Sequence, residues 1–391
     1  MRTKDRTQGR RSCQQQVRAA DVRSLAESWL VTALQCDLHG SRCTTSMFFR
    51  VLFWAASRMA SVTAACCNLA EAPCHQTIRD AIRRLLPKRF RTLETRLHAA
   101  FTTHLPRSLR RGARVLAIDW HSIPYHGHPH KRDDELRRSK PEQGTTTFHV
   151  YATACLVHHG ERFTVALTHV AKNDTNHTVL TRLLQQIQEL SLRIQVVLMD
   201  RQFATAAVIA LLQKQNIPFV MPAVLRGRPP ENPRHATGLR ALKRSAKPGW
   251  YSHTQKHGTT TVSYSVCVAW RTALHPRKKT RRRKVLLFVC WKIRRPPAEI
   301  RELYRRRFGI ESSYRQLKQA RIRTSTRDPL VRLFYVALAL ILRNVWVWLH
   351  LMKLADRPGY PETVQLARLT LIRLLTLLAH SDGGPEIASD G

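Results

Sequence analysis

Two short apolar runs that each end at an aspartate place the strongest constraint on the fold. The run Val115 to Ile118 precedes Asp119, and the run Ile194 to Met199 precedes Asp200. Apolar runs of about four to eight residues are typical of strands buried on both faces, as in a sheet covered by helices. The sequence therefore predicts two central strands that each carry a carboxylate at the carboxyl end, the edge where open α/β sheets bind ligands.

The segments around these runs complete the pattern of an α/β sheet. Strand-like and helical spacings follow the order β-β-β-α-β-α-β, with further strands expected at 147–157, 162–170 and 217–221 and helices at 174–192 and 204–215. A polar, basic stretch at 131–143 is expected to be a loop.

The first 110 residues have apolar positions at helical spacing and are predicted to form a helical domain. Within it, residues 61–84 hold two short helical stretches separated near Pro73, and the second ends in Arg83 and Arg84. This pattern is typical of a helix-turn-helix that binds DNA, and equally of a corner in a plain helical bundle. The sequence leaves both interpretations open.

Residues 223–297 interrupt the α/β pattern and are predicted to form a β-rich insertion. The part at 226–249 is rich in Pro, Gly and Arg and is expected to be a loop or linker. The parts at 250–270 and 284–292 alternate like paired strands, and a basic tip at 277–284 separates them.

The charge of the chain indicates a polyanionic partner. Sixty-six Lys and Arg residues stand against 26 Asp and Glu residues, which gives a formal net charge of +40. Such a charge repels itself in a compact protein, and nucleic acid relieves the repulsion while releasing condensed counterions. A ribosomal-type protein, or a basic composition without specific meaning, is the alternative interpretation.

Cysteine usage and apolar segments indicate a cytoplasmic protein. The nine cysteines form no Cys-x-x-Cys pair, and a zinc site from Cys66, Cys67, Cys74 and His75 has the wrong spacing. No apolar core follows the basic amino terminus, so no signal peptide is expected. The longest apolar stretch, 333–342, is too short to span a bilayer, and no membrane association is expected.

The most informative segment is 299–322, at the start of a helical region that extends to about residue 350. On a helix, four of its residues fall within a sector of about 60°, namely Tyr304, Arg307, Glu311 and Lys318. A second stripe beside it would dock the helix on the sheet, and consists of Leu303, Ile310 and Leu317. The simpler interpretation is that Arg307 and Glu311 form a surface ion pair four residues apart.

Together, Asp119, Asp200 and Glu311 supply three carboxylates for metal ions. Two-metal phosphoryl transfer needs hard oxygen ligands that hold two Mg²⁺ ions about 4 Å apart, with the attacking and leaving oxygens in line. Taken alone, each aspartate is as consistent with a strand-end cap as with a metal ligand.

The spacing Tyr304-x2-Arg307-x3-Glu311-x6-Lys318 resembles the Y-(2)-R-(3)-E-(6)-K signature of the family-four insertion-sequence transposases. The segments around Asp119 and Asp200 are similar to that family as well, and the resemblance covers about residues 110–350. It implies an RNase H-like core with Asp119, Asp200 and Glu311 as catalytic and metal-binding acids. It also implies a β-strand insertion between the second and third acid, and contacts from Tyr304, Arg307 and Lys318 to DNA phosphates.

The resemblance implies a division of the chain into a helical DNA-binding domain at 1–110, a catalytic domain in two parts at 111–222 and 298–391, and the insertion at 223–297. The activity implied is cut-and-paste transposition with Mg²⁺, for which Mn²⁺ may substitute, on double-stranded transposon ends and target. A homodimer on paired ends, in the bacterial cytoplasm at the nucleoid, is also implied. In relatives a tryptophan of the insertion stacks on a flipped base, and here the candidates are Trp250, Trp270 and Trp291.

One departure from the family concerns the residues after the first acid, Trp120-His121-Ser122, where small hydroxyl residues or a further acid are expected. A soft-metal site built from nearby histidines is a minor alternative, and the histidines are His121, His126, His128 and His130. If Trp120 blocked the metal site, the protein would be an inactive or domesticated DNA-binding repressor. A general metal nuclease on the same core is the third possibility.

Overall fold

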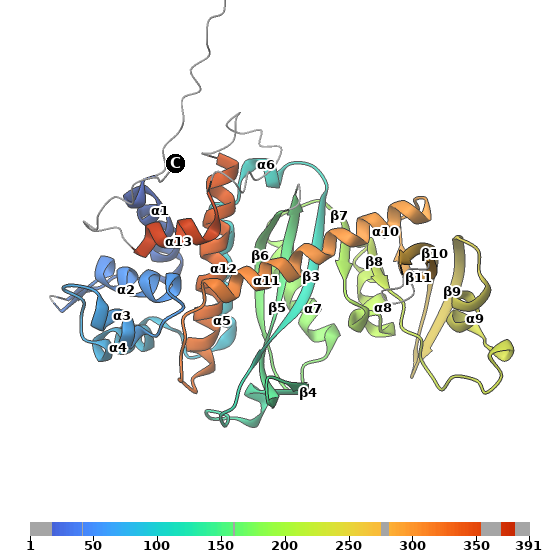
Figure 1. Ribbon diagram of the computed structural model, residues 1–391, viewed down its shortest axis with the longest axis horizontal. Helices are drawn as coiled ribbons and strands as arrows, with labels where there is room; N and C mark the ends of the chain where they lie inside the picture. The colour runs from blue at the N-terminus through green and yellow to red at the C-terminus, as the bar shows by residue number, and fades with distance from the viewer. Residues whose placement is uncertain (1–17, 41, 159–160, 275–280, 353–368, 380–391) are drawn as a thin grey trace, which may run out of the picture.

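The computed structural model of the chain describes residues 18–40, 42–158, 161–274, 281–352 and 369–379 (Figure 1). It is a mixed α/β protein with one large mixed sheet and a group of N-terminal helices. In Figure 1 the N-terminal helices lie at one end of the long axis, the sheet in the middle and the strands of residues 249–291 at the other end.

The strands and helices expected along the chain between 115 and 221 all form, and the strands pair as follows. Strand β3 (Arg114–Pro124) pairs antiparallel with β5 (Thr145–His158), which pairs antiparallel with β6 (Glu161–Val170). On its other side β3 pairs parallel with β7 (Ile194–Met199), and β7 pairs parallel with β8 (Phe219–Pro222). The expected loop at 131–143 is partly wrong, because β4 (Arg137–Glu142) forms there and pairs with the near end of β5.

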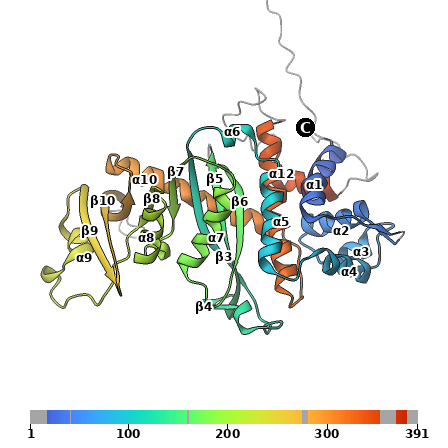
Figure 2. The ribbon, with the colours of Figure 1, turned by 180° about the vertical axis from the view of Figure 1, so that it is seen from behind.

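Helices cover both faces of the sheet, as the apolar runs predicted. Helices α7 (Asn176–Gln188) and α8 (Ala206–Lys214) lie on one face, and α10 (Pro297–Arg305) and α11 (Gly309–Gln319) cross the other (Figures 1 and 2). The side chains of β3 alternate accordingly: Ala117 packs with Tyr314 of α11 in a small cluster, while its neighbour Leu116 points to the other face and belongs to the large core.

Local sequence explains where several helices begin. Ser or Thr precedes the first residue of α2 (Thr45–Ser57), α3 (Val62–Asn68), α7 and α8, and its side chain accepts a hydrogen bond from the backbone N–H three residues on. This cap satisfies one of the donors that the first turn of a helix leaves without a partner.

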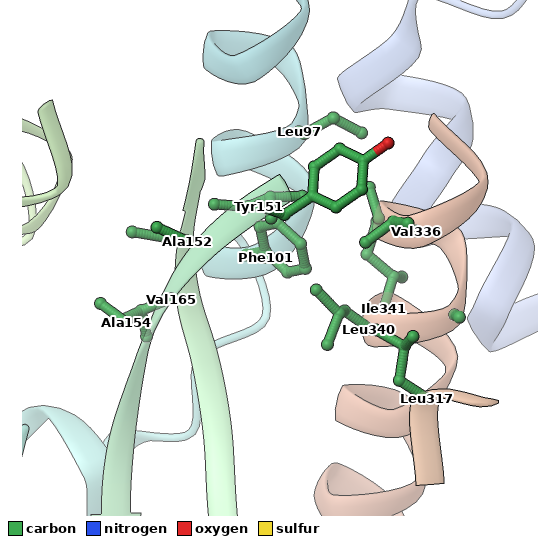
Figure 3. Close-up of a cluster of buried hydrophobic side chains, with 14 of the residues drawn as sticks. Leu97, Phe101, Tyr151, Ala152, Ala154, Val165, Leu317, Val336, Leu340 and Ile341 are labelled. Carbon is green, nitrogen blue, oxygen red and sulfur yellow. The ribbon is translucent and has the colours of Figure 1, made fainter. Parts of the chain in front are cut away.

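The N-terminal helices pack against each other and against the sheet. They are α1 (Ala19–Leu34), α2, α3, α4 (His75–Leu85), α5 (Phe90–Thr102) and α6 (Arg107–Arg110), with a two-stranded ribbon of β1 (His39–Gly40) and β2 (Cys43–Thr44). Nδ1 of His98 in α5 lies 2.9 Å from the Val165 C=O of β6, and Figure 3 shows Leu97 and Phe101 of α5 near the Tyr151 ring of β5. Helices α3 and α4 are the two short helices predicted at 61–84.

The strands at 249–291 extend the same sheet. Strand β11 (Arg281–Trp291) pairs antiparallel with β8, then with β10 (Thr260–Leu274), which pairs with β9 (Gly249–His257). The expected single strand at 250–270 is therefore a hairpin, and the expected loop at 226–249 contains the helix α9 (Gly238–Ser245). Of the basic tip expected at 277–284, residues 277–280 lie outside the described residues and 281–284 belong to β11.

Helix α12 (Pro329–Met352) lies in the helical region that the sequence predicted to extend to about residue 350. The helix continues through Arg343 and Asn344, and among the described residues it alone has the length and apolar composition to cross a membrane. However, 89% of its most apolar window is buried inside the protein, where it packs with α13 (Leu371–Ala379), α5 and β6. It is the central helix of the hydrophobic core.

The two polar residues of α12 bind the edge of the sheet. The side chain of Asn344 accepts a hydrogen bond from the backbone N–H of Thr164 at 2.9 Å and donates one to its C=O at 2.7 Å. Among the described strands β6 pairs only with β5, so backbone groups of Thr164 that face away from β5 need partners other than a strand. Arg343 donates to Gln316 of α11 at 2.7 Å and to Glu161 of β6 at 3.0 Å.

We predict that Asn344→Ala lowers the free energy of unfolding by about 2–3 kcal/mol, because it leaves a buried N–H and a buried C=O without partners. Urea denaturation measures the change. The matched control is Asn68→Ala, since the Asn68 amide is exposed and its loss should cost under about 0.5 kcal/mol. Equal changes in the two variants would contradict this account.

Burial also predicts sensitivity to acid. It lowers the pKa of His121 to about 3, of His149 to about 3 and of His169 to about 4, so the folded protein holds all three neutral. In the folded protein the pKa of each histidine lies below the unfolded value of about 6.5. The three histidines therefore make their full contribution to the free energy of unfolding only above about pH 6.5. This contribution is lost as the pH falls from about 6.5 toward 4, by about 2 kcal/mol for each residue at pH 5.

Denaturant unfolding at a series of pH values measures this loss. We expect His149→Gln to reduce the pH dependence below pH 6.5 by about one proton, while His257→Gln, at an exposed position, leaves it unchanged. The same pH dependence in both variants would contradict the assignment.

Candidate active site

The parallel register of β3 and β7 brings the two predicted aspartates together. The last paired residues are Ile118 and Met199, and Asp119 and Asp200 come directly after them. The expectation that both aspartates end a strand is right for Asp200 and wrong for Asp119, which lies in the middle of β3. The reason is that β7 stops at Met199 while β3 continues to Pro124 on its pairing with β5.

A buried arginine connects the two carboxylates. Nη1 of Arg307 donates to Oδ2 of Asp119 at 2.7 Å, and its Nη2 lies 3.9 Å from Oδ1 of Asp200. Its Nε donates to the Tyr304 hydroxyl at 3.0 Å. The other Asp119 oxygen accepts from the backbone N–H of Trp120 at 2.9 Å. The guanidinium of Arg307 therefore links the signature segment to the carboxylates of both β3 and β7.

A second contact holds the backbone of Asp119. The Tyr314 hydroxyl of α11 donates to the Asp119 C=O at 3.0 Å and lies 2.8 Å from the Thr153 hydroxyl. Thr153 is the residue of β5 opposite Asp119. The ring of His121 stacks on Tyr314 with 4.6 Å between centroids. Three elements thus fix the position of this aspartate.

The electrostatics of the site are those of a carboxylate that is short of positive charge. Burial raises the pKa of Asp119 to about 6, even though Arg307 acts to lower it. Burial acts to lower the pKa of Arg307, but attraction to Tyr304, Asp119 and Asp200 outweighs it and raises that pKa. The arrangement favours a further cation beside Asp119.

The signature segment is not one continuous helix as expected. Helix α10 ends at Arg305, a 3-10 turn covers Arg306–Phe308, and α11 begins at Gly309. A side chain at Gly309 would collide with the guanidinium of Arg162, so the chain approaches β6 closely here. The expected single stripe is therefore divided, with Tyr304 on α10, Arg307 in the turn, and Glu311 and Lys318 on α11.

The members of that stripe have different surroundings. Tyr304 and Arg307 are buried, and Tyr304 packs against Phe288 of β11. Glu311 lies in α11 between Arg307 and Tyr314, which both contact Asp119, but its side chain is outside the described residues. Lys318 is exposed near the end of α11.

Trp120 does not lie beside the carboxylates. Side chains alternate along a strand, so Trp120 points to the face opposite Asp119. There its ring meets Phe203 edge-on, and the Arg137 guanidinium lies 4.7 Å above it.

The other residues considered as metal ligands lie apart. His126, His128 and His130 are exposed in the loop after β3. Within the described part of the chain, no three His, Cys, Asp or Glu side chains lie together as ligands, and the Glu311 side chain is not part of that description.

The three tryptophans considered for base stacking occupy different positions on β9–β11. The Trp250 indole donates to the Arg295 C=O at 3.0 Å. Trp291 stacks on Phe219 of β8. The Arg283 guanidinium lies 3.6 Å above the Trp270 ring, and that cation covers the ring face.

Sequence reasoning missed Tyr314 and Thr153. Tyr314 could have been found, since it lies one helical turn after Glu311 and so faces the same direction. Thr153 could not, because its position opposite Asp119 depends on the register of β3 and β5, and no residue in either strand specifies that register.

The comparisons with known proteins concern the same region. The sequence profile of the family "Transposase DDE domain" matches residues 110–345. The fold is similar to a solved structure titled as the piggyBac transposase synaptic complex with hairpin DNA, with a TM-score of 0.55. That similarity covers 95% of this chain and 82% of the other at 13% identity, so it bears on the fold alone. No curated protein sequence matches the chain.

We predict that Arg307→Met lowers the free energy of unfolding by about 3–5 kcal/mol, since it leaves Asp119 buried without its partner. The adjacent Arg306 is exposed, and Arg306→Met is the matched control with an expected change under about 0.5 kcal/mol. Adding Asp119→Asn to Arg307→Met should cost less than Asp119→Asn alone, as measured in a double-mutant cycle. Additive changes would contradict the pairing.

Proposed function

The chain belongs to the transposase DDE domain family, and on that premise we propose that it is a DNA transposase that moves its own insertion sequence by cut-and-paste. The family carries out phosphoryl transfer on DNA. The observation that supports this reaction most directly is the register of β3 and β7, which places Asp119 and Asp200 side by side with Arg307 between them.

The residues at this position fit a divalent metal ion. Asp119 and Asp200 offer hard carboxylate oxygens, and a buried carboxylate whose pKa is raised to about 6 gains from a neighbouring cation. With Glu311 they would hold Mg²⁺, for which Mn²⁺ can substitute. The metal would supply positive charge at the attacking and leaving oxygens and lower the pKa of a bound water.

The residues of the signature segment would bind and orient the DNA. Arg307 fixes the Asp119 carboxylate and adds positive charge beside the phosphate that reacts, where negative charge develops. Tyr304 positions Arg307 through its hydroxyl. Lys318, exposed two turns after Glu311 on α11, is available to a neighbouring phosphate.

In the proposed reaction, water attacks the phosphorus at the transposon end and the 3′-oxygen leaves, which frees a 3′-hydroxyl. This hydroxyl attacks a phosphorus of the opposite strand and the 3′-oxygen of the flanking DNA leaves, so that the transposon end closes as a hairpin. Water then hydrolyses the hairpin and frees the 3′-hydroxyl again, which attacks a phosphorus of target DNA and displaces a 3′-oxygen of the target. No covalent enzyme intermediate is required.

The proposal assigns a role to each part of the chain. Residues 1–110, with the α3–α4 pair, would bind the transposon end, and 111–222 with 298–391 would form the catalytic domain. The insertion at 223–297 would contact flanking DNA, where Trp250, Trp270 or Trp291 stacks on a flipped base. Two copies of the chain would act on paired ends, in the bacterial cytoplasm.

One observation favours a second function, that of an inactive DNA-binding repressor. Arg307 forms an ion pair with Asp119 at 2.7 Å, and a cation there competes with a metal ion for the same carboxylate. A repressor would keep its DNA binding after loss of all three acids, whereas a transposase would lose excision.

We predict that Asp119→Asn, Asp200→Asn and Glu311→Gln each reduce excision by about 100-fold or more, because each removes a charged oxygen that the transition state requires. The measurement is excision in cells of a marker bracketed by the gene's own flanking DNA. Glu302→Gln, at an exposed position of α10, is the matched control and should leave excision unchanged.

Excision that survives Glu311→Gln would mean that the third acid is misassigned. Absence of excision by the unaltered protein, with binding to the ends intact, would establish the repressor instead.

A further inference from the structure

A cavity of about 550 Å³ opens at the end of β3, beyond the carboxylates. Its lining includes Ile123 and Tyr125 from β3 and the loop after it, and His149 and Tyr151 from β5. These residues alternate in step with Asp119 and Thr153, so the cavity lies on the same face of the sheet as the candidate active site. Ile123 is four residues from Asp119, or about 13 Å along the strand.

The charge of the cavity is positive. Four arginines contribute to its lining and no acidic residue does, and the arginines are Arg321, Arg323, Arg327 and Arg332. Arg332 is held in place by the C=O of Thr326 at 2.7 Å, and its guanidinium lies 4.5 Å above the Tyr125 ring. A fixed group of guanidiniums beside aromatic rings is suited to an anion that carries a planar group.

Two side chains of the lining have polar atoms that are buried without a partner among the described residues. They are the Tyr151 hydroxyl and both ring nitrogens of His149, on residues that are 0% and 1% exposed. In Figure 3 the Tyr151 ring packs near Phe101 and Val336, and its hydroxyl points away from the sheet. Unpaired buried polar atoms are costly, and a ligand with donors and acceptors would pair them.

The cavity also lies next to the N-terminal helices. A second cavity of about 310 Å³ shares Arg323, Thr324, Ser325 and Tyr335 with the first and extends to Ser61, Thr63 and Arg79 of the α3–α4 pair. The backbone N–H of Arg323 donates to the Ala60 C=O at 3.0 Å, which fixes the shared loop to these helices. A strand that runs from α3–α4 to Asp119 would pass this opening.

We propose that the cavity binds one unpaired nucleotide of the DNA strand whose scissile phosphate lies at Asp119 and Asp200. This inference rests on the proposed function and adds a recognition site to it. A volume of about 550 Å³ lies within the range of roughly 300–1,000 Å³ of pockets that enclose small ligands, and it is too small for a duplex.

The lining fits both parts of such a nucleotide. The arginines bind the phosphate, the ring of Tyr125 or Tyr335 stacks on the base, and His149 and Tyr151 hydrogen-bond to its polar edge. A phosphate alone would leave the aromatic rings without a role. The distance along β3 places the nucleotide within a few base steps of the cleaved bond.

Equilibrium binding of the full chain to fluorescent oligothymidylate, with EDTA to remove divalent metals, tests the proposal apart from catalysis. We expect Tyr151→Phe to weaken binding of the single strand about fivefold to tenfold without lowering the melting temperature, because it removes a hydroxyl that is unpaired in the free protein. Tyr264→Phe is the matched control for stability. It removes a hydroxyl bonded to Gln255 and should lower the melting temperature.

Arg321→Gln should weaken binding about tenfold and reduce the slope of log affinity against log salt by about 0.7, the change expected for one phosphate contact to a single strand. Arg107→Gln, on exposed α6 before the opposite end of β3, should change neither quantity.

Unchanged affinity in both cavity variants would overturn the proposal, and so would equal losses for the single strand and a blunt duplex of the same sequence. Displacement of the oligonucleotide by thymidine monophosphate or inorganic phosphate at comparable concentrations would assign the cavity to a free nucleotide or phosphate instead. If excision fails while the binding results are as expected, the transposase function is refuted and the assignment of the cavity stands. If excision occurs while both cavity variants bind normally, the assignment of the cavity is refuted and the transposase function stands.

Discussion

The ion pair between Arg307 and Asp119 is the interaction on which the arrangement of the site depends. A charge placed in a poorly hydrated position is stable only with a well-oriented partner, so neither residue is tolerated there without the other. Asp119 is on β3 and Arg307 lies 188 residues later, beyond the strands at 249–291. The pair therefore requires that the chain return to the central strands after the insertion and that the 3-10 turn place Arg307 over β3.

The same principle recurs at the other end of the site. Asn344 and Arg343, in the middle of an otherwise apolar helix, bond to backbone and side-chain groups of β6 and to α11. Hydrogen bonds of this kind are directional, whereas apolar contacts allow a helix to slide or rotate. They fix α12 against the sheet, and α11 is held between α12 and β3. The position of Glu311 on α11 thus derives from polar contacts on both sides of it.

Much of the central fold could be predicted from the sequence, because it rests on short-range patterns. The apolar runs before Asp119 and Asp200 specified the two central strands, and helical spacing specified α7 and α8 between and after them. The rest depends on contacts distant in sequence. The pairing with β5 prolongs β3 beyond Asp119, and the helical spacing of 329–352 did not indicate which groups of the sheet Arg343 and Asn344 bind.

In the candidate site, too, short-range spacing predicted some residues, whereas contacts distant in sequence determined the rest. Spacing alone identified Tyr304 and Arg307, and both reach the carboxylates or each other. Spacing on an ideal helix could not anticipate the 3-10 turn, because the turn accommodates the close approach of Gly309 to Arg162 on a different element. Nor could it assign Arg307 to Asp119, since the partner of a buried guanidinium is decided by the packing of α10 and α11 on the sheet.

The pairing of β11 with β8 has a mechanical consequence. Only β8 separates β11 from β7, the strand that ends beside Asp200, and adjacent strands are joined here by backbone hydrogen bonds. Such a ladder is stiff along its hydrogen bonds, in contrast to a flexible tether. The hairpin of β9 and β10 is therefore rigidly connected to the rest of the sheet. A force applied to its outer strand, β9, is transmitted across the sheet to the neighbourhood of Asp200.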